Sequence, residues 1–405
     1  MTSFDTSPPL GVWRALLALA VVFVMLTTTG WTALRGQRSE SPLQASLSAW
    51  EDGRIGGRPL PDPDAAPARL ARFFASLTAA QRGHLARRYP LAVGNMNGAP
   101  LSLRYRANRI ALRQAREVER DRMHDDRLSP AGQHTAGRRM HRLESLLRTG
   151  RQILAFDPDG AGRVAEVLGD LHRAERVSVV VPGVDTDLLT FQRTNRRYAA
   201  PVGMAQSLYA AQRAASPSTR TAVIAWADYT APSGIGMDAA TAGRAQQGAV
   251  RLDALVRALP GRAPVSLFCH SYGSVVCGVA APALPSRVTD VAVAGSPGMR
   301  AEKAADLRTG AQVWAMRDAD DWIEDVPYLE LGGLGHGADP VSGAFGARVL
   351  SARGAHGHTG YFEPGTDSVA NLAEIGVGAY HAVDCADGTG TCRAGLSGAT
   401  TPGRA

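Results

Sequence analysis

The first candidate for chemistry is Ser271, which lies in the segment APVSLFCHSYGSVV at residues 263–276. The apolar run before Ser271 predicts a buried strand, and the small apolar residues after it predict a helix. The segment follows the pattern G-x-S-x-G, except that Cys269 replaces the first glycine. On such a strand-to-helix turn a serine hydroxyl projects from the sheet, where it can act as a nucleophile. The alternative is an ordinary Ser-Gly turn between a core strand and a core helix.

A serine nucleophile needs an acid that orients its base, and this acid is expected after the serine in the chain. Three aspartates, Asp318, Asp320 and Asp321, follow a predicted strand at residues 311–316. We predict Asp321 as the acid, because the apolar pair after it can return to the core while its carboxylate faces the site. Asp320 is the second candidate. The alternative for these residues is a solvated acidic turn.

The base is expected on a loop after the last strand, in the segment GAHGHTGY at residues 354–361. We predict His358 as the base, with His356 as the alternative. His381 comes at the end of a predicted helix, where packing is the favoured role. His270 directly precedes the nucleophile. Because adjacent side chains point apart, we expect His270 to be a packing or hydrogen-bonding neighbour of the site.

The H-x-H spacing of His356 and His358 is also compatible with a metal site, with His336 and Asp339 nearby in the sequence. No clear strand or helix sets this spacing, so we predict no metal and no cofactor. Residues 157–160 resemble the start of a calcium loop, but the pattern does not continue, and a turn is predicted there.

An oxyanion that forms at the reacting carbonyl needs backbone N–H donors. One is expected from Tyr272, the residue after the nucleophile, and one from the loop after an earlier strand. The sequence VVVPGVDTD places Pro182 and Gly183 at such a strand end. Proline has no N–H, so the second donor is predicted to be Gly183 or Val184. The alternative is an ordinary Pro-Gly turn.

Short apolar runs alternate with helical patterns from residue 152 onward, which predicts an α/β fold with a mostly parallel sheet covered on both faces. The predicted strands are 151–156, 164–168, 177–181, 221–227, 265–269, 288–294, 311–316 and the weaker 346–350. Residues 241–259 are predicted to be helical. Together these elements define a predicted domain at residues 151–382, followed by a C-terminal tail at 383–405.

Residues 68–150 are predicted to be helical, with a capping box at Thr78 and Gln81 and a long helix at 103–123. This segment is expected to be either a cap over the active site or a packing arm. Residues 36–67 are rich in proline and glycine without apolar periodicity, and we predict a linker there.

Residues 1–35 are predicted to be a membrane anchor or signal segment. The stretch 15–34, ALLALAVVFVMLTTTGWTAL, is free of charge and long enough to span a bilayer. No clear cleavage site follows it, so we favour an uncleaved single-pass anchor in the cell membrane over secretion. Arginines flank both ends, so charge does not decide the orientation.

The four cysteines fall into two pairs with different expectations. Cys269 and Cys277 flank the nucleophile, and we expect both to be small buried hydrophobic side chains. Cys385 and Cys392 bracket a polar loop and suit a short disulfide, with free thiols as the alternative. A disulfide at that position favours a body outside the cytoplasm.

The chain of 405 residues carries a formal net charge of +7, and 45% of its residues are hydrophobic, enough for a full core. Nearly all of its basic residues are arginine, with Lys303 the only lysine, and they are mixed with acids. Without a nucleic-acid-binding motif, we predict no nucleic-acid partner.

Several segments together resemble an actinobacterial family of α/β-hydrolase-fold proteins of unknown function. They are SLTAAQRGHLARRYPLAVGNMNGAPLSLRYRANR, FDPDGAGRVAEVLGD, SVVVPGVDT, CHSYGSVV, GSPGM, LGHGADPVSGAFGARVL and HTGYFEPGTDSVANLA. The resemblance covers most of residues 70–380. It implies an α/β-hydrolase fold with Ser271 as nucleophile, His358 as base and the Pro182-Gly183 turn at the oxyanion site. The family usually has glycine where this chain has Cys269.

From the residues and the resemblance together, we expect a serine hydrolase that acts on a small-molecule or lipid-like acyl ester. The second hypothesis is an acyltransferase that passes the acyl group to an alcohol or amine in the cell envelope. The third hypothesis is a catalytically silent binding module with the same fold.

Overall fold

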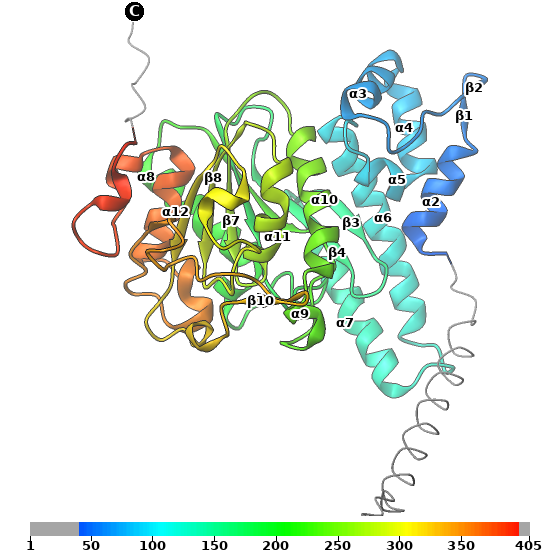
Figure 1. Cartoon of the computed structure of the whole chain (residues 1–405). Coiled ribbons are helices and arrows are strands. Elements are labelled where there is room, and N and C mark those ends of the chain that lie inside the picture. The colour runs from blue at the N-terminus through cyan, green and yellow to red at the C-terminus, as the bar shows by residue number, and fades with distance from the viewer. Residues whose placement is uncertain (1–39, 397–405) are drawn as a thin grey trace, which may run out of the picture. The chain divides into compact units, whose positions relative to one another are not determined.

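The computed structural model describes residues 40–396. Within this range, the residues from Pro42 onward form one compact unit. Its described part is built around an eight-stranded sheet with the strand order β12-β9-β8-β7-β5-β6-β4-β3 (Figure 1). The strands are β3 (Gln152–Asp157), β4 (Arg163–Gly169), β5 (Arg176–Val181), β6 (Thr221–Ala227), β7 (Val265–His270), β8 (Val288–Ala294), β9 (Gln312–Met316) and β12 (Arg348–Val349).

The sheet is mostly parallel, as predicted. The strands from β12 to β6 pair in parallel, whereas β4 runs antiparallel to both β6 and β3. The β3–β4 hairpin forms around the turn at residues 157–160, where the sequence predicts it. The expected fold class is therefore confirmed, and each predicted strand is present with ends that differ by a few residues.

Helices cover both faces of the sheet (Figure 1). α10 (Gly243–Ala258) and α11 (Gly273–Ala280) pack on the face reached by Val179 and Leu267. α8 (Pro201–Ala215) and α12 (Asp367–Val377) pack on the face reached by Val180 and Phe268. Neighbouring residues in a strand point to opposite faces, and both faces are buried, so these strands read as continuous apolar runs.

The chain changes direction across the sheet at β5. This strand pairs with β6 on one side and with β7 on the other. In an open parallel sheet, such a switch point leaves a crevice at the carboxyl ends of the strands, where ligands bind. The loops that follow β5 and β7 meet there, and they carry Gly183 and Ser271.

The segment before the sheet is helical, with a capping box at Thr78 and Gln81 as predicted. Its helices are α3 (Pro67–Ser76), α4 (Ala79–Arg88), α5 (Pro90–Asn95), α6 (Leu101–Arg122) and α7 (Pro130–Leu146). α6 lies along β3, the edge strand of the sheet (Figure 1). This position fits the packing arm rather than a cap over the site.

Polar side chains of the helical arm bond to the backbone of β3. Arg104 donates to the carbonyl of Leu154 at 2.9 Å, and Asn108 donates to the carbonyl of Ile153 at 2.9 Å. Asn95 both donates to the carbonyl of Phe156 and accepts from its N–H. Edge strands expose backbone groups that otherwise remain unpaired. The arm therefore satisfies three carbonyl groups and one N–H group of this edge.

The linker predicted at residues 36–67 differs from the structure over the described part of that range. It contains helix α2 (Pro42–Glu51) and the short hairpin of β1 (Arg54–Ile55) and β2 (Arg58–Pro59). Trp50 is fully buried against Phe74 and Tyr89, and its ring N–H donates to the carbonyl of Pro61. A single large aromatic side chain, Trp50, anchors this segment. One buried residue produces no apolar periodicity, so the sequence pattern gave no sign of the packing.

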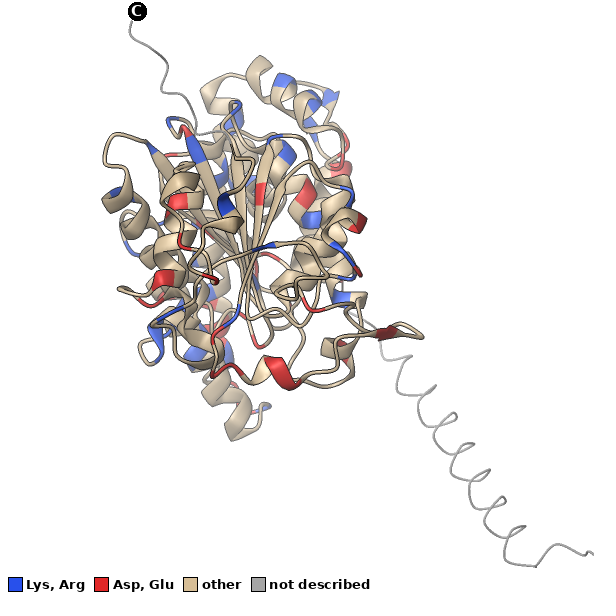
Figure 2. Cartoon of the chain, turned by 60° about the vertical axis from the view of Figure 1, so that its left-hand side comes forward, with Lys and Arg blue, Asp and Glu red and all other residues tan. Residues whose placement is uncertain are grey.

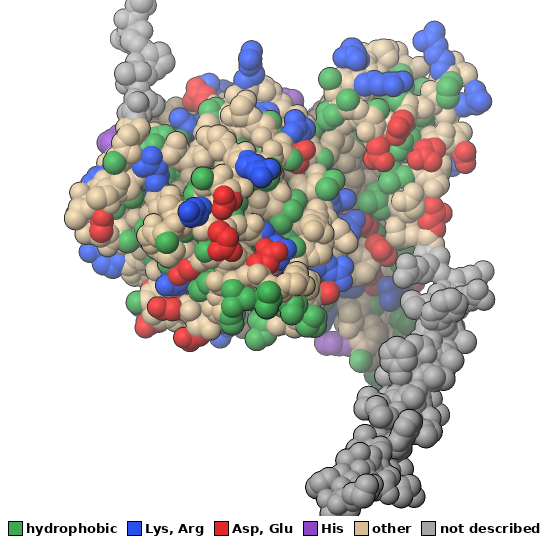
Figure 3. Space-filling model, viewed as in Figure 1, with side chains coloured by type: hydrophobic (Ala, Val, Ile, Leu, Met, Phe, Trp, Pro, Cys, Tyr) green, Lys and Arg blue, Asp and Glu red, His purple; other side chains and the backbone are tan. Residues whose placement is uncertain are grey.

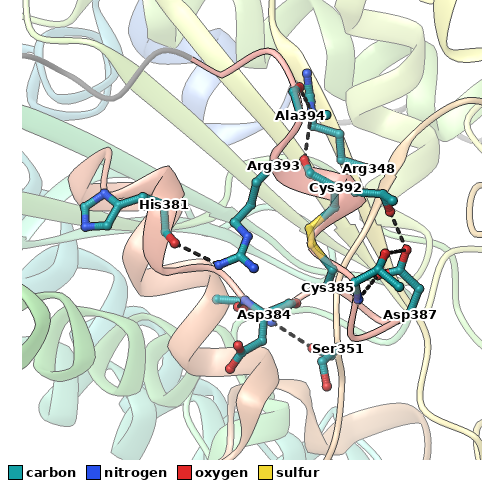
Figure 4. Close-up of a disulfide and its surroundings, with 12 residues drawn as sticks. Arg348, Ser351, His381, Asp384, Cys385, Asp387, Cys392, Arg393 and Ala394 are labelled. Atoms are coloured by element: carbon teal, nitrogen blue, oxygen red, sulfur yellow. Dashed lines mark hydrogen bonds between the residues drawn. A yellow bond between two sulfur atoms is a disulfide. The ribbon is translucent and has the colours of Figure 1, made fainter.

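The predicted C-terminal tail is also packed on the body as far as it is described. Cys385 and Cys392 form a disulfide, as predicted, beside the edge strand β12 (Figure 4). Arg348 of β12 donates to the carbonyls of Cys392 and Ala394, and the N–H of Ser351 donates to the carbonyl of Asp384. The segment covers the second edge of the sheet.

Residues 40–396 contain no helix with the length and apolar character needed to cross a bilayer. The stretch predicted as an anchor, residues 15–34, lies outside the described residues. Basic and acidic residues are interspersed over the fold (Figure 2), and ion pairs such as Arg139–Glu119 and Arg151–Glu166 join several of them. The expectation of no nucleic-acid partner stays a prediction.

Candidate active site

Ser271 occupies the turn between β7 and α11 with φ of +54°. This left-handed conformation is unfavourable for a residue with a side chain, so close packing on both sides must hold it. A Cβ at Gly273 would lie 2.2 Å from the carbonyl oxygen of Val181, and one at Gly183 would lie 2.6 Å from the Cβ of Ser271. Only glycine fits at either position, so the serine is fixed against the end of β5.

A disulfide joins Cys269 and Cys277 across this turn. The two residues are buried, as expected, but the prediction of two unlinked hydrophobic side chains is wrong. Cys269 is the next-to-last residue of β7, and Cys277 lies in the second turn of α11, so strand and helix converge there. The spacing of eight residues gave no sign of this pairing, because the approach depends on the tight turn at Ser271.

The structure brings the three predicted side chains together in a single line of hydrogen bonds. Nε2 of His358 lies 2.8 Å from Oγ of Ser271. Nδ1 of His358 lies 2.8 Å from Oδ1 and 3.1 Å from Oδ2 of Asp321. A carboxylate only accepts hydrogen bonds, so Nδ1 carries the proton. Nε2 is therefore free to accept the hydroxyl proton of Ser271.

The loops that carry Asp321 and His358 pack around a glycine. Asp321 caps a 3₁₀ turn after β9, and His358 lies in a second 3₁₀ turn, Gly357–Phe362. Gly295, which follows β8 with φ of +56°, lies beneath both. A Cβ there would lie 2.8 Å from Oδ2 of Asp321 and 3.2 Å from Nδ1 of His358.

The Asp321 carboxylate is buried and fully engaged. Oδ2 accepts a 2.5 Å hydrogen bond from the hydroxyl of Tyr361, and Oδ1 accepts one from the N–H of Ile323. Burial raises the pKa of Asp321, but the hydrogen bonds from His358, Tyr361 and Ile323 outweigh it and hold the pKa below its ordinary value. Asp321 is therefore ionised at neutral pH.

The side chain of His270 forms a hydrogen bond with the backbone of the loop that carries His358. Its Nε2 lies 2.6 Å from the carbonyl oxygen of His358, which can only accept, so Nε2 carries a proton. Burial, together with the nearby His358 ring, lowers the pKa of His270 to about 3. His270 is thus a neutral hydrogen-bonding neighbour of the site, the role expected from its sequence position.

The predicted oxyanion donors lie next to the nucleophile. Gly183 contacts Ser271, and Val184 and Tyr272 line the cavity beside it. Within residues 40–396, none of these three N–H groups donates a hydrogen bond to the protein. The Tyr229 hydroxyl donates to the carbonyl of Pro182 at 2.6 Å, which fixes the turn. The assignment of these donors to an oxyanion stays a prediction.

The alternative residues lie away from this line of hydrogen bonds. Asp318 accepts from the N–H of Gly357, and Asp320, His356 and His381 are exposed. His336 bonds the carbonyl of Ala239, while Asp339 pairs with Arg317. In the described part of the chain, no group of three or more His, Cys, Asp or Glu side chains is arranged to hold a metal.

A cavity of about 290 Å³ opens beside Ser271. Ser271 is only 6% exposed, and the cavity is its access to solvent. Apolar groups form most of the wall: Val184, Ile235, Pro297, Trp322, Ile323 and Val326. The helical segment at 68–150 contributes no residue to it. An apolar wall next to a polar reacting group suits an uncharged acyl chain.

Sequence reasoning missed two groups that act on the three central side chains. Tyr361 bonds Asp321, and the Trp322 ring lies 4.7 Å from the His358 ring. A signal for Tyr361 was available, because residues i and i+3 share one side of a 3₁₀ turn and Tyr361 follows His358 by three. Trp322 and Ile323 are the apolar pair expected to return to the core; Ile323 is buried, but for Trp322, which is 47% exposed and lines the cavity, this prediction is wrong.

Comparison with known proteins agrees with this architecture. Residues 157–331 match a protein family described as alpha/beta hydrolase. Two uncharacterized proteins of Mycobacterium tuberculosis, from strains CDC 1551 and H37Rv, are each 27% identical over 439 residues. The alignment covers 92% of this chain and 65% of theirs, so the chain spans less than two thirds of their length.

Three solved structures show some similarity to this chain. XC6422 of Xanthomonas campestris, an a/b serine hydrolase, is 16% identical with a TM-score of 0.30, over 44% of this chain and 74% of that chain. A predicted CIB-like hydrolase of Thermoplasma acidophilum is 15% identical with a TM-score of 0.35, over 56% and 95%. Est1E of Butyrivibrio proteoclasticus is 13% identical with a TM-score of 0.33, over 56% and 99%.

The family match, the mycobacterial relatives and the covered parallel sheet agree with the resemblance seen in the sequence. The chain has an α/β-hydrolase fold.

Proposed function

We propose that this protein is a serine hydrolase that cleaves an ester or a related acyl compound. One observation carries the proposal: Oγ of Ser271 lies 2.8 Å from Nε2 of His358, whose Nδ1 lies 2.8 Å from Asp321. A nucleophile, a base within hydrogen-bond reach and an ionised group that orients the base are the three parts of this chemistry.

In the first half of the reaction, Oγ of Ser271 attacks the carbonyl carbon of the ester while Nε2 of His358 takes the hydroxyl proton. The Asp321 carboxylate stabilises the imidazolium that forms. The N–H groups of Tyr272 and of Gly183 or Val184 stabilise the negative oxygen of the tetrahedral intermediate. One such donor commonly contributes about 3 kcal/mol to lowering the barrier.

The intermediate then collapses to an acyl-enzyme. Nε2 of His358 returns its proton to the leaving alcohol, and the acyl group remains bonded to Oγ of Ser271. In the second half, His358 takes a proton from water, which attacks the acyl carbonyl. The acid leaves, and Ser271 regains its proton. The apolar cavity holds the acyl chain during both halves.

The test combines a fluorophosphonate probe, which reacts with activated serines, and hydrolysis of p-nitrophenyl butyrate. Ser271→Ala should abolish both signals. His358→Ala and Asp321→Asn should lower kcat by several orders of magnitude, whereas His356→Ala and Asp320→Asn serve as matched controls and should retain activity. Labelling that survives Ser271→Ala would remove the assignment of the nucleophile.

The same acyl-enzyme could pass its acyl group to an alcohol or amine instead of water. Product analysis with and without glycerol as acceptor separates the two outcomes: free acid alone supports hydrolysis, and acylglycerol as the dominant product supports transfer. A wild-type chain that neither labels nor turns over substrate would be a binding module with a hydrolase fold.

We also propose that the body works outside the cytoplasm, attached to the cell membrane through residues 15–34. The two disulfides support this location, because such bonds persist in oxidising compartments. Alkylation of intact cells with a membrane-impermeant thiol reagent before and after reduction tests it. Thiols that are free in freshly lysed, unreduced cells would contradict the location.

A further inference from the structure

Exposed hydrophobic side chains are concentrated around the mouth of the cavity. Of the eight large hydrophobic residues that are exposed in the described chain, six lie in the segments 235–237 and 322–334. We call these six the apolar rim: Ile235, Met237, Trp322, Leu329, Leu331 and Leu334. Figure 3 shows hydrophobic side chains gathered over the region that Figure 1 labels α9 and β10. The two segments come from separate parts of the chain.

Hydrogen bonds hold these segments side by side. Leu334 forms an isolated bridge with Thr241, and Nε2 of His336 bonds the carbonyl of Ala239 at 2.7 Å. The hairpin of β10 (Glu330–Leu331) and β11 (Leu334–Gly335) closes through Gly332 and Gly333, both with positive φ. A two-residue turn with positive φ at both central residues matches the twist of the flanking strands. These bonds and the hairpin join the two segments of the rim into one surface.

The rim is continuous with the cavity of Ser271. Ile235 and Trp322 line the cavity and are also 77% and 47% exposed. An acyl chain that leaves the cavity would pass directly onto the exposed side chains of the rim. Monomeric soluble proteins rarely expose contiguous apolar surface of this kind without a binding role.

Charged groups at the rim are paired or acidic. Arg300 bonds Glu330 at 2.5 Å, and Arg244 bonds Asp238 at 2.9 Å. Pairing removes most of the net charge that would oppose contact with an apolar phase. Asp325 is exposed next to Trp322, and so is Glu324, which lies 3.6 Å from Arg317. Negative charge there disfavours an anionic surface, so the surface that fits best carries no net charge.

We propose that the apolar rim docks the protein on an uncharged lipid surface, from which an acyl ester enters the cavity of Ser271. The inference rests on the proposed hydrolase function and names its substrate class: esters that are aggregated or held in a lipid layer. Met237 and Leu331 lie on the rim without lining the cavity, so their apolar side chains serve docking and not the reaction.

The experiment uses the chain from residue 40 to 405, which contains the compact unit that begins at Pro42 with its sheet and all of its described hydrophobic clusters. The test variant is Met237→Ser with Leu331→Ser. The matched control is Val118→Ser with Val250→Ser, which removes two exposed apolar side chains from α6 and α10. Each protein is assayed on dissolved p-nitrophenyl butyrate, on emulsified tributyrin and for flotation with phosphatidylcholine vesicles.

We expect the rim variant to hydrolyse the dissolved ester at the wild-type rate. Its activity on the emulsion and its binding to vesicles should each fall by about tenfold or more, since two exposed hydrophobic contacts are lost. The control variant should match the wild type in all three assays. Vesicles that contain phosphatidylglycerol should bind less protein than neutral ones.

Equal behaviour of the rim variant and the wild type on emulsion and vesicles would overturn the inference. A wild-type body that sediments as a dimer, with a monomeric rim variant and no vesicle binding, would overturn it in favour of a second copy as the occupant. Vesicle flotation needs no catalysis, so it tests docking even where the dissolved ester is not hydrolysed. Failure on the dissolved ester, with no fluorophosphonate labelling, would instead overturn the proposed function.

Discussion

The hydroxyl of Tyr361 donates a 2.5 Å hydrogen bond to Oδ2 of Asp321, on the carboxylate whose Oδ1 accepts from His358. This bond helps to hold the carboxylate beside the imidazole, and it favours the ionised form of Asp321. Tyr361 is therefore a positioning residue.

We predict that Tyr361→Phe lowers kcat by about ten- to a hundredfold, because a small misplacement of a reacting group has effects of that size. The free energy of unfolding should also fall by about 1–3 kcal/mol at pH 7. The pKa of Asp321 is lowered below 3.8, so this stabilisation is complete above that pH and fades as the pH falls below it. Urea unfolding and steady-state rates measure both effects.

Tyr380→Phe is the matched control for this change. The hydroxyl of Tyr380 also donates to a buried carboxylate, Asp290, at 2.9 Å, but away from the site. It should cost stability without a change in kcat. A Tyr361→Phe enzyme with wild-type kcat would contradict the positioning role.

His270 predicts a pH dependence of stability. Its pKa is lowered from 6.5 to about 3 in the folded state, so the unfolded chain binds a proton between these values that the folded chain does not. Stability from this residue is complete above pH 6.5 and decreases as the pH falls, by about 1.4 kcal/mol per pH unit. His270→Gln keeps a donor for the carbonyl of His358 and should remove this part of the slope.

The measurement is urea unfolding at several pH values from 7 to 4.5. His381→Gln, a change at an exposed histidine, is the control and should keep the wild-type slope. Parallel slopes for His270→Gln and the wild type would show that His270 is not neutral and buried as described.

The two disulfides close loops of similar length, with separations of eight and seven residues. Each should therefore contribute about 2–3 kcal/mol of stability through the chain entropy of the unfolded state. We predict that replacing Cys269 and Cys277 by alanine also lowers kcat, because the pair joins the strand and helix on either side of Ser271. The double alanine variant of Cys385 and Cys392 should lose only stability. Equal kcat for the two variants would argue against a role of the first disulfide in the site.

Gly183 predicts a steric effect on the nucleophile. A Cβ there would lie 2.6 Å from Cβ and 2.9 Å from Oγ of Ser271. Gly183→Ala should lower kcat/KM by about a hundredfold or more and cost about 1–3 kcal/mol of stability, since one of the two residues must move. Gly137→Ala, at an open position within α7, is the control and should retain activity with stability slightly raised. Esterase rates and thermal unfolding give both values.

The strands and the order of serine, aspartate and histidine could be predicted because they depend on local patterns. Continuous apolar runs such as the one in β5 indicate buried strands. Gly273, two residues after Ser271, indicates that α11 and the neighbouring strand β5 approach each other closely. The choice of Asp321 over its neighbours also depended on a local pattern, the apolar pair that follows it. Ile323 is buried as expected, whereas Trp322 is 47% exposed and belongs to the apolar rim.

Other features depend on contacts between distant segments. The Cys269–Cys277 disulfide requires the left-handed turn at Ser271. The burial of Trp50 requires Phe74 of α3 and Tyr89, which lies between α4 and α5. Neither has a periodic signature. The difference between a cap and a packing arm for residues 68–150 was equally open, because both use amphipathic helices.

The bonds from Asn95, Arg104 and Asn108 to β3 have a consequence for how the molecule behaves in bulk. A shortened chain that starts at residue 151 would present an open β-ladder, a template onto which another molecule can add its own strand. By pairing with β3, the helical arm keeps this edge from associating with another molecule. The residue pattern changes clearly between residues 150 and 151, but a truncation at that boundary would expose β3 and favour aggregation.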